Sequence, residues 1–133
     1  MKIVIDSNVY LSAFLTQGLS NRVLDICIDK HEIFISPWII AELQQKLKKK
    51  FKVKQPDLNK FLNFIRSIAK TIEPRGDIPD ISRDKDDNNI LFLAEYTESD
   101  LIITGDKDLL ILKKHRKTVI INPRDYMEMY YKR

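Results

Sequence analysis

The sequence has few of the residues on which several classes of protein depend. Cys27 is the one cysteine among 133 residues, which excludes an internal disulfide framework and a zinc site built on cysteines. The glycines, Gly18, Gly76 and Gly105, are far apart, so there is no glycine-rich loop to cradle nucleotide phosphates. No apolar run approaches the roughly 18 residues that span a bilayer, and the first run stops at Asp6, unlike a signal peptide. We therefore expect a cytoplasmic protein with no membrane partner.

Short aliphatic runs alternate with helical patterns along the chain. Strands are predicted at residues 2–5, 32–36, 71–74, 101–103 and 118–121, and helices at residues 20–30, 36–51, 57–70 and 87–98. Short apolar strands that are joined by helices form parallel sheets covered on both faces. We therefore expect an α/β fold, a three-layer α/β/α sandwich with a central parallel sheet of about five strands. Because the sequence has no repeat and no flexible linker, residues 1–133 are expected to form a single domain.

Two acidic residues follow strands of the predicted sheet. Asp6 comes directly after the first strand, and Asp106 stands two residues beyond Thr104, which follows the fourth. Strands of one parallel sheet point the same way, and ligands of such sheets bind beyond the carboxyl ends of the strands. We therefore expect both acids at one edge of the sheet. Asp6 is the strongest candidate for a site residue, because a charge at the end of a buried strand seldom stays unpaired.

Two predicted helices can add carboxylates to the same edge. Glu42 lies at the margin of the apolar stripe of the second helix, and Asp87 lies on the apolar side of the fourth. Carboxylates that converge repel one another unless they are protonated or bind a cation. Mg²⁺ and Mn²⁺ prefer oxygen ligands and keep bound waters for chemistry. We therefore expect a site for Mg²⁺ or Mn²⁺ that is formed by Asp6, Glu42, Asp87 and Asp106.

Three of these acids have a plainer alternative role. Asp87 could cap a helix, as aspartate commonly does. Glu42 could instead pair with Lys46, four residues later on the same helix. Asp106 could simply belong to a turn after Gly105.

Polar residues beside these acids could orient them. Ser7 and Asn8 supply a hydroxyl and an amide next to the first acid, although either could instead cap the helix that follows. Thr104 could bond an acid or end a strand. Asp108 could be an accessory ligand, but we favour a cap of the segment 108–112.

Positive and negative charges are separated along the chain, although the net charge is only +4. One short segment is rich in lysine: Lys46, Lys48, Lys49, Lys50, Lys52 and Lys54. Residues 77–108 hold ten of the nineteen acidic residues. A protein of this kind could hold cations in one place and a polyanion in another. The alternative is a solvated helix end whose lysines complement the helix dipole.

Four segments together resemble the PIN-domain family of metal-dependent nucleases in their order and spacing. They are IDSNV, SPWIIAELQQKL, RDKDDNNILFLAEY and DLIITGDKDLL, which span most of residues 2–115. The last two are similar to a subgroup of toxins from toxin–antitoxin systems. By this resemblance the metal-site positions are Asp6, Glu42, Asp87 and Asp106, with Ser7, Asn8 and Thr104 nearby. The subgroup often has a third acid where Asn88 stands, so the choice of ligand among Asp84, Asp86 and Asp87 stays open.

The resemblance implies an endoribonuclease that hydrolyses RNA phosphodiester bonds through a metal-activated water. The basic segment would then hold the backbone of single-stranded RNA, with Lys46, Lys49, Lys50 and Lys52 as the contacts. As a toxin, the protein would be restrained by a small antitoxin protein, and a homodimer is expected by the same analogy. The alternative function is a non-catalytic RNA-binding or protein-interaction domain on the same fold.

Overall fold

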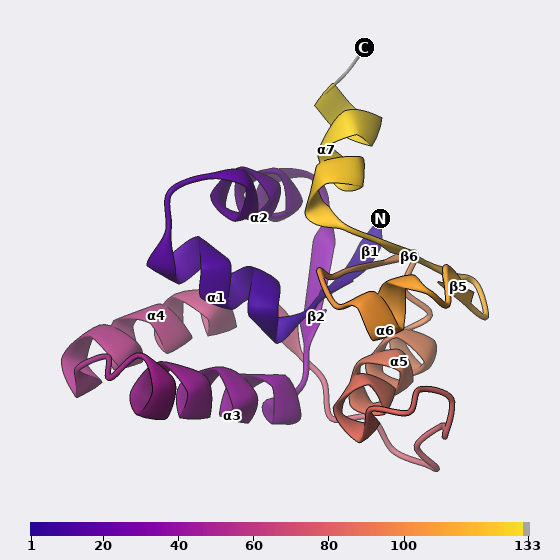
Figure 1. Ribbon diagram of the computed structural model, residues 1–133, viewed down its shortest axis with the longest axis horizontal. Coiled ribbons are helices and arrows are strands. Elements are labelled where there is room, and N and C mark those ends of the chain that lie inside the picture. Colours follow the sequence, from indigo (N-terminus) through magenta and orange to yellow (C-terminus); the bar gives the residue numbers. More distant parts are fainter. Residues whose placement is uncertain (132–133) are drawn as a thin grey trace.

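The computed structural model describes residues 1–131 and the side chains of residues 1–130 (Figure 1). Its strands are β1 (Lys2–Ile5), β2 (Glu32–Ile35), β3 (Lys70–Thr71), β4 (Leu101–Ile103), β5 (Lys114–His115) and β6 (Thr118–Ile121). Its helices are α1 (Ser7–Leu15), α2 (Leu19–Lys30), α3 (Pro37–Gln45), the π-helix η1 (Lys46–Lys50), α4 (Gln55–Ile68), α5 (Lys85–Thr97), α6 (Lys107–Leu110) and α7 (Pro123–Tyr131). None of these helices is long and apolar enough to cross a bilayer.

The described strands form one sheet in the order β3-β2-β1-β4-β6-β5. Five of them run parallel, which confirms the predicted parallel sheet of about five strands. The sixth, β5, pairs antiparallel with β6 at one edge and was not predicted. Two residues are too few to show the alternation of apolar and polar side chains by which a strand is recognised in a sequence.

The central strands are apolar on both faces because helices cover both sides of the sheet. Helix α2 contacts β2 on one side, and α5 contacts β1 and β2 on the other, as Figure 1 shows. Ile3, Val4 and Ile5 of β1 are accordingly all fully buried. The architecture is the three-layer sandwich expected from the sequence, and its buried centre holds the carboxyl ends of β1 and β4 in place.

Helix α3 begins as the sequence predicts. The side chain of Ser36 accepts a hydrogen bond from the backbone N–H of Ile39 at 3.2 Å, and Pro37 occupies the first turn. The predicted helix 36–51 is not uniform, because its last turn widens into the π-helix η1, closed by a bond from the Phe51 N–H to the Lys46 carbonyl at 3.3 Å. Such π-helical turns are frequent at functional sites.

Two fully buried tyrosines differ in how their hydroxyl groups are satisfied. The Tyr126 hydroxyl lies 2.9 Å from His31 Nε2 and accepts a hydrogen bond from Cys27 Sγ at 3.6 Å. The Tyr10 hydroxyl has no hydrogen-bond partner among the described residues. A buried polar group that lacks a partner costs roughly 1–3 kcal/mol of stability.

We predict that the same substitution has opposite effects at these two positions. Tyr10→Phe should raise the free energy of unfolding by about 1 kcal/mol, because it removes an unpaired hydroxyl from the core. Tyr126→Phe should lower the free energy of unfolding by a similar amount, because it breaks a buried hydrogen bond. Urea denaturation of the two variants measures both changes, and equal destabilisation of the two would contradict this reading of the core.

Candidate active site

The structure brings the four predicted acids around one small cavity. It has a volume of about 100 Å³ and lies beyond the carboxyl ends of β1 and β4. Its acidic lining residues are Asp6, Glu42, Asp84, Asp86, Asp87 and Asp106. These side chains come from the end of β1, from α3, from the start of α5 and from the start of α6. We refer to this hollow below as the acidic cavity.

A single hydroxyl group links the two acids that follow strands. Strands β1 and β4 pair with Ile5 opposite Ile103, so Asp6 and Thr104 leave the sheet side by side. Thr104 Oγ1 donates a hydrogen bond to Asp6 Oδ2 at 2.7 Å and accepts one from the backbone N–H of Asp106 at 3.0 Å. Thr104 is fully buried and Asp6 is 3% exposed. Thr104 therefore bonds the carboxylate of Asp6 and the backbone of Asp106 at the same time.

Burial raises the pKa of the Asp6 carboxyl above its usual value. The hydrogen bond from Thr104 acts in the opposite direction because it stabilises the ionised form, while the negative charges of Glu42 and Asp106 raise the pKa further. Burial and nearby negative charges therefore destabilise the ionised form of Asp6, and the hydrogen bond from Thr104 stabilises it.

Ser7 joins two of the acids, and Asn8 lines the same cavity and contacts a lysine. The Ser7 hydroxyl donates a close hydrogen bond to Glu42 Oε1 and lies 3.4 Å from Asp6 Oδ1. The Asn8 side chain accepts a hydrogen bond from Lys46 Nζ at 3.0 Å and so orients a lysine. Neither residue caps α1, whose N-cap position is Asp6.

Glu42 has both of the roles that the sequence left open. It lines the acidic cavity and also pairs with Lys46, whose Nζ lies 3.1 Å from Glu42 Oε1. The two residues are four apart on one helix face, which is the usual geometry for such a pair.

The acids of the loop before α5 divide between capping and the cavity. The N-cap of α5 is Asp84, whose side chain accepts a hydrogen bond from the Asp86 backbone N–H at 2.9 Å. The capping alternative for Asp87 is therefore wrong, and its buried carboxylate faces the cavity. Carboxylate oxygens of Asp84, Asp87 and Asp106 lie within 4.8 Å of one another. A group of this kind, made of hard oxygen donors, fits a divalent cation.

The pKa of Asp87 shows how strongly these charges interact. Burial raises the pKa of Asp87 to about 7, and the neighbouring carboxyl groups of Asp106, Asp84 and Asp6 contribute to the increase. Burial also raises the pKa of Asp86, with the charges of Asp84 and Glu42 acting in the same direction. The negative charge of the cavity is therefore only partly compensated by the protein itself.

Asp106 and Asp108 lie at the start of α6 and have separate partners. Asp106 is the N-cap of α6, and its Oδ1 accepts a hydrogen bond from the Asp108 backbone N–H at 2.8 Å. The prediction that Asp108 caps this segment is wrong. Its side chain instead accepts a hydrogen bond from Arg83 Nη2 at 3.1 Å, outside the residues that line the cavity. Asp106 therefore combines a capping role with a place in the acidic cavity.

Two buried residues, Ser82 and Asn88, hold the loop before α5, and this role was not predicted from the sequence. Asn88 accepts hydrogen bonds from the backbone N–H groups of Ile81 and Ser82 and donates one to the Ser82 carbonyl. An ionised carboxylate could not donate that last bond, so an acid at the position of Asn88 would not hold the loop in the same way. The Ser82 hydroxyl lies 3.3 Å from Asp87 Oδ2 and donates to it. In the sequence, the one sign of such a loop is that Ser82 stands two residues before the capping residue Asp84.

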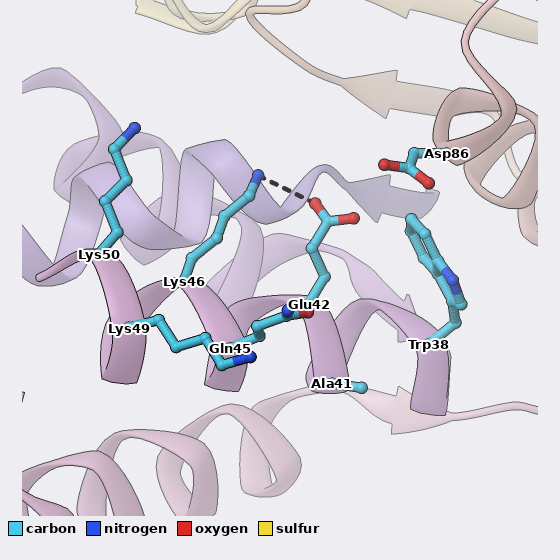
Figure 2. Close-up of a pocket in the computed structure, with 8 residues that line it drawn as sticks. All are labelled: Trp38, Ala41, Glu42, Gln45, Lys46, Lys49, Lys50 and Asp86. Carbon is cyan, nitrogen blue, oxygen red and sulfur yellow. Dashed lines mark hydrogen bonds and ion pairs between the residues drawn. The ribbon is translucent and has the colours of Figure 1, made fainter. Parts of the chain in front are cut away.

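A larger groove opens next to the acidic cavity. It has a volume of about 490 Å³ and follows the exposed side of α3 and η1 (Figure 2). Its lining includes Trp38, Glu42, Lys46, Lys49, Lys50 and Asp86. Glu42, Lys46 and Asp86 also line the acidic cavity, so the two hollows are adjacent. Of the four lysines predicted to bind RNA, three line this groove, and Lys52 lies beyond the end of η1.

We predict that the acidic cavity destabilises the metal-free protein at neutral and higher pH. The pKa of Asp87 rises from its ordinary value of 3.8 to about 7 in the folded protein, so the folded state binds this proton more tightly than the unfolded state does. The stability from this group is present at low pH and is lost as the pH rises from about 4 to about 7. Asp87→Asn should raise the free energy of unfolding at pH 8, where the wild-type carboxyl is forced to ionise, and should flatten the pH dependence.

The measurement is urea denaturation in a chelator at several pH values. Asp77→Asn is a matched control, because Asp77 is an exposed residue of the preceding loop that is not among the cavity-lining acids. If wild type and Asp87→Asn had the same pH dependence, the described charge repulsion would be wrong.

Comparison with known proteins agrees with this geometry. A family model described as "PIN domain" matches residues 2–108. The chain is 31% identical, over an aligned length of 147 residues, to the uncharacterized protein MJ1680 of Methanocaldococcus jannaschii, covering 99% of this chain and 93% of that protein. Its fold is similar to a chain of VapBC2 from Rickettsia felis, solved bound to a DNA fragment from their promoter. That likeness has a TM-score of 0.67 at 16% identity and covers 92% of this chain and 98% of that chain, and it concerns the fold alone. Since the family model covers most of the sequence, the chain belongs to the PIN domain family.

Proposed function

We propose that this protein is an endoribonuclease that depends on Mg²⁺ or Mn²⁺ and hydrolyses RNA phosphodiester bonds. The observation that carries the proposal is the convergence of four separate chain segments on one acidic cavity. A structural role would not require acids from the ends of two strands and from two helices to meet in one place, since their repulsion costs stability. Membership of the PIN domain family supports the same conclusion.

The residues of the cavity fit a divalent cation. Asp84, Asp87 and Asp106 supply carboxylate oxygens within 4.8 Å of one another, and Asp6 and Glu42 line the same cavity. We propose Asp87 and Asp106, with Asp6, Glu42 and Asp84 around them, as the groups that hold the ion. A bound Mg²⁺ or Mn²⁺ would lower the pKa of a water molecule and offset the negative charge that develops on the phosphoryl oxygens.

The neighbouring residues would keep the carboxylates in a fixed arrangement. The hydroxyl groups of Thr104 and Ser7 donate to Asp6 and Glu42, which leaves these side chains little freedom to rotate. Ser82 has the same role toward Asp87. Lys46, held by Asn8 and Glu42, is the positive group that stands between the acidic cavity and the groove. It is placed to attract the phosphate of an RNA strand.

We predict that cleavage of RNA requires both a divalent metal and the acids of the cavity. The protein should cut assorted single-stranded RNAs with Mg²⁺ or Mn²⁺ and show no cleavage in excess chelator. Asp106→Asn and Asp87→Asn should each reduce the rate at least about 100-fold, because a neutral amide is a poor ligand for a hard cation. Gel analysis of labelled RNA fragments measures the rates.

The matched control is Asp77→Asn, which removes one exposed acid from the same part of the chain and should leave the rate unchanged. Calorimetric titration with Mn²⁺ should show binding to wild type that Asp87→Asn weakens. If wild-type protein neither binds a divalent metal nor cuts any RNA, the chain is a non-catalytic domain on the PIN fold.

We also propose that the protein is the toxin component of a toxin–antitoxin system that acts in the cytoplasm. Two observations support this role: the resemblance of its acidic segments to such toxins, and the likeness of its fold to a chain of VapBC2. An uncontrolled ribonuclease would damage the cell that makes it. Its partner would be a small antitoxin protein that covers the acidic cavity, and the toxin would form a homodimer by the same analogy.

This role predicts that overexpression of the protein alone arrests growth and that Asp106→Asn does not. Purification from native cells should recover the protein with a small partner that inhibits RNA cleavage when it is added back. Growth curves and the inhibition of cleavage measure the two effects. A wild-type protein that is active on RNA but harmless on overexpression and recovered without a partner would contradict the toxin role while leaving the nuclease intact.

A further inference from the structure

Trp38 occupies a position that the acidic site does not explain. It is the one tryptophan of the sequence and lies in the first turn of α3, half-buried against the core. One side of its ring borders the groove, and it also borders a second hollow of about 180 Å³ with Asn89 and Phe92. A large aromatic ring that stands between two hollows keeps part of its surface available for contact.

The groove has a regular order of side chains along one helix face. Trp38, Glu42 and Lys46 follow one another at intervals of four residues, and Lys50 continues the series in η1. In the α-helical part each interval corresponds to about 6 Å along the axis. Figure 2 shows the indole at one end, the Glu42 carboxylate in the middle and the ammonium groups of Lys46 and Lys50 toward the other end. An aromatic ring and the cationic end therefore flank an acid of the candidate active site.

The charges of the groove differ between its two ends. Lys49 and Lys50, both exposed, provide positive charge at the end formed by η1. Asp86 lies at the end formed by Trp38, where a phosphate would be repelled. A nucleic-acid strand in this groove would therefore bind best with its phosphates near the lysines and an uncharged, planar group against Trp38. The nucleobase is the part of a nucleic acid with that chemistry.

We propose that Trp38 is a stacking platform for one unpaired base of the RNA substrate, while Lys49 and Lys50 hold the phosphates on the opposite side of the acidic cavity. This proposal rests on the proposed ribonuclease function and adds to it the contact that holds a base of the substrate. Stacking requires a base that is free of a partner strand, so the preferred substrate is single-stranded next to the bond that is cut. Because every base has an aromatic face, stacking alone selects for an unpaired base and not for its identity.

The tryptophan itself reports on this contact. A base stacked on an indole quenches its fluorescence, and no other tryptophan contributes to the signal. In the experiment, a short single-stranded oligoribonucleotide is added stepwise to the full-length wild-type protein in the presence of a chelator, and the tryptophan fluorescence is recorded. A parallel titration follows the fluorescence anisotropy of the same oligoribonucleotide carrying a dye, which measures binding without regard to stacking. A set of abasic oligoribonucleotides, each lacking one base, completes the probes.

We expect binding with quenching, and loss of the quenching when one particular base is missing. A duplex of the same sequence should not quench. In the cleavage assay with metal, Trp38→Leu should raise the KM for single-stranded RNA by about 5- to 150-fold, the range that alanine substitution gives for one stacked base. Its dependence on the metal should stay the same, and Trp38→Phe should recover much of the affinity. Far-ultraviolet circular dichroism checks that both variants are folded.

The lysines supply a second readout in the same assay. Lys49→Ala combined with Lys50→Ala should weaken the binding of intact and abasic oligoribonucleotides equally. It should also reduce the steepness of the plot of log K against log salt concentration by about 1.4, because two phosphate contacts are lost. Lys60→Ala combined with Lys70→Ala removes the same charge from α4 and β3, outside the groove, and should change neither quantity.

Three results would overturn the proposal. Binding by anisotropy without any change of tryptophan fluorescence would show that RNA passes the site without touching Trp38, and would leave the ribonuclease function standing. Equal quenching by every abasic oligoribonucleotide would exclude stacking of a particular base. No binding of any oligoribonucleotide and no cleavage would remove the proposed function together with this inference, and the groove would then be free for a helix of a partner protein.

Discussion

The pairing of strand β1 with strand β4 is the constraint on which the candidate site depends. It sets Ile5 opposite Ile103, so the chain leaves the sheet at Asp6 and Thr104 in adjacent positions. The Thr104 hydroxyl then bonds both Asp6 and the backbone of Asp106. Because these strands are buried on both faces, their ends cannot shift without disturbing the packed core. The position of the acids is therefore determined by the interior of the protein and not by flexible loops.

The groups that hold these acids orient them without neutralising them. Hydroxyl and backbone N–H groups make most of the contacts, and Lys46 supplies positive charge at Glu42. Burial, together with the neighbouring carboxyl groups, raises the pKa of Asp87 to about 7. The apolar core must offset this repulsion, which is a typical cost of a preorganised functional site. A cation that binds the carboxylates would remove the repulsion and stabilise the folded state, so stability and metal binding are linked.

The sequence predicted the fold well because its strongest signals are local. Short apolar runs between amphipathic segments determine a parallel sheet covered by helices, and the carboxyl ends of its strands must share one edge. That rule alone placed Asp6 near Asp106. The points that the sequence left open or predicted wrongly lie in loops and at helix ends, where a shift of one residue changes the direction of a side chain. Asn8 contacts Lys46, Asp84 caps α5, and Asp108 pairs with Arg83, none of which spacing could decide.

By itself, then, the amino-acid sequence determined the layers of the fold, the strand ends that carry acids and the existence of a basic segment. Tertiary structure decided which acids meet, because a contact between β1, α3, α5 and α6 depends on how distant segments pack and not on their spacing. It also decided that Trp38 borders a groove beside those acids. The periodicity of the sequence does not distinguish such a tryptophan from one in the core. The physical reason is that local patterns specify which face of an element is buried, whereas the partner on that face is chosen by the packing of the whole chain.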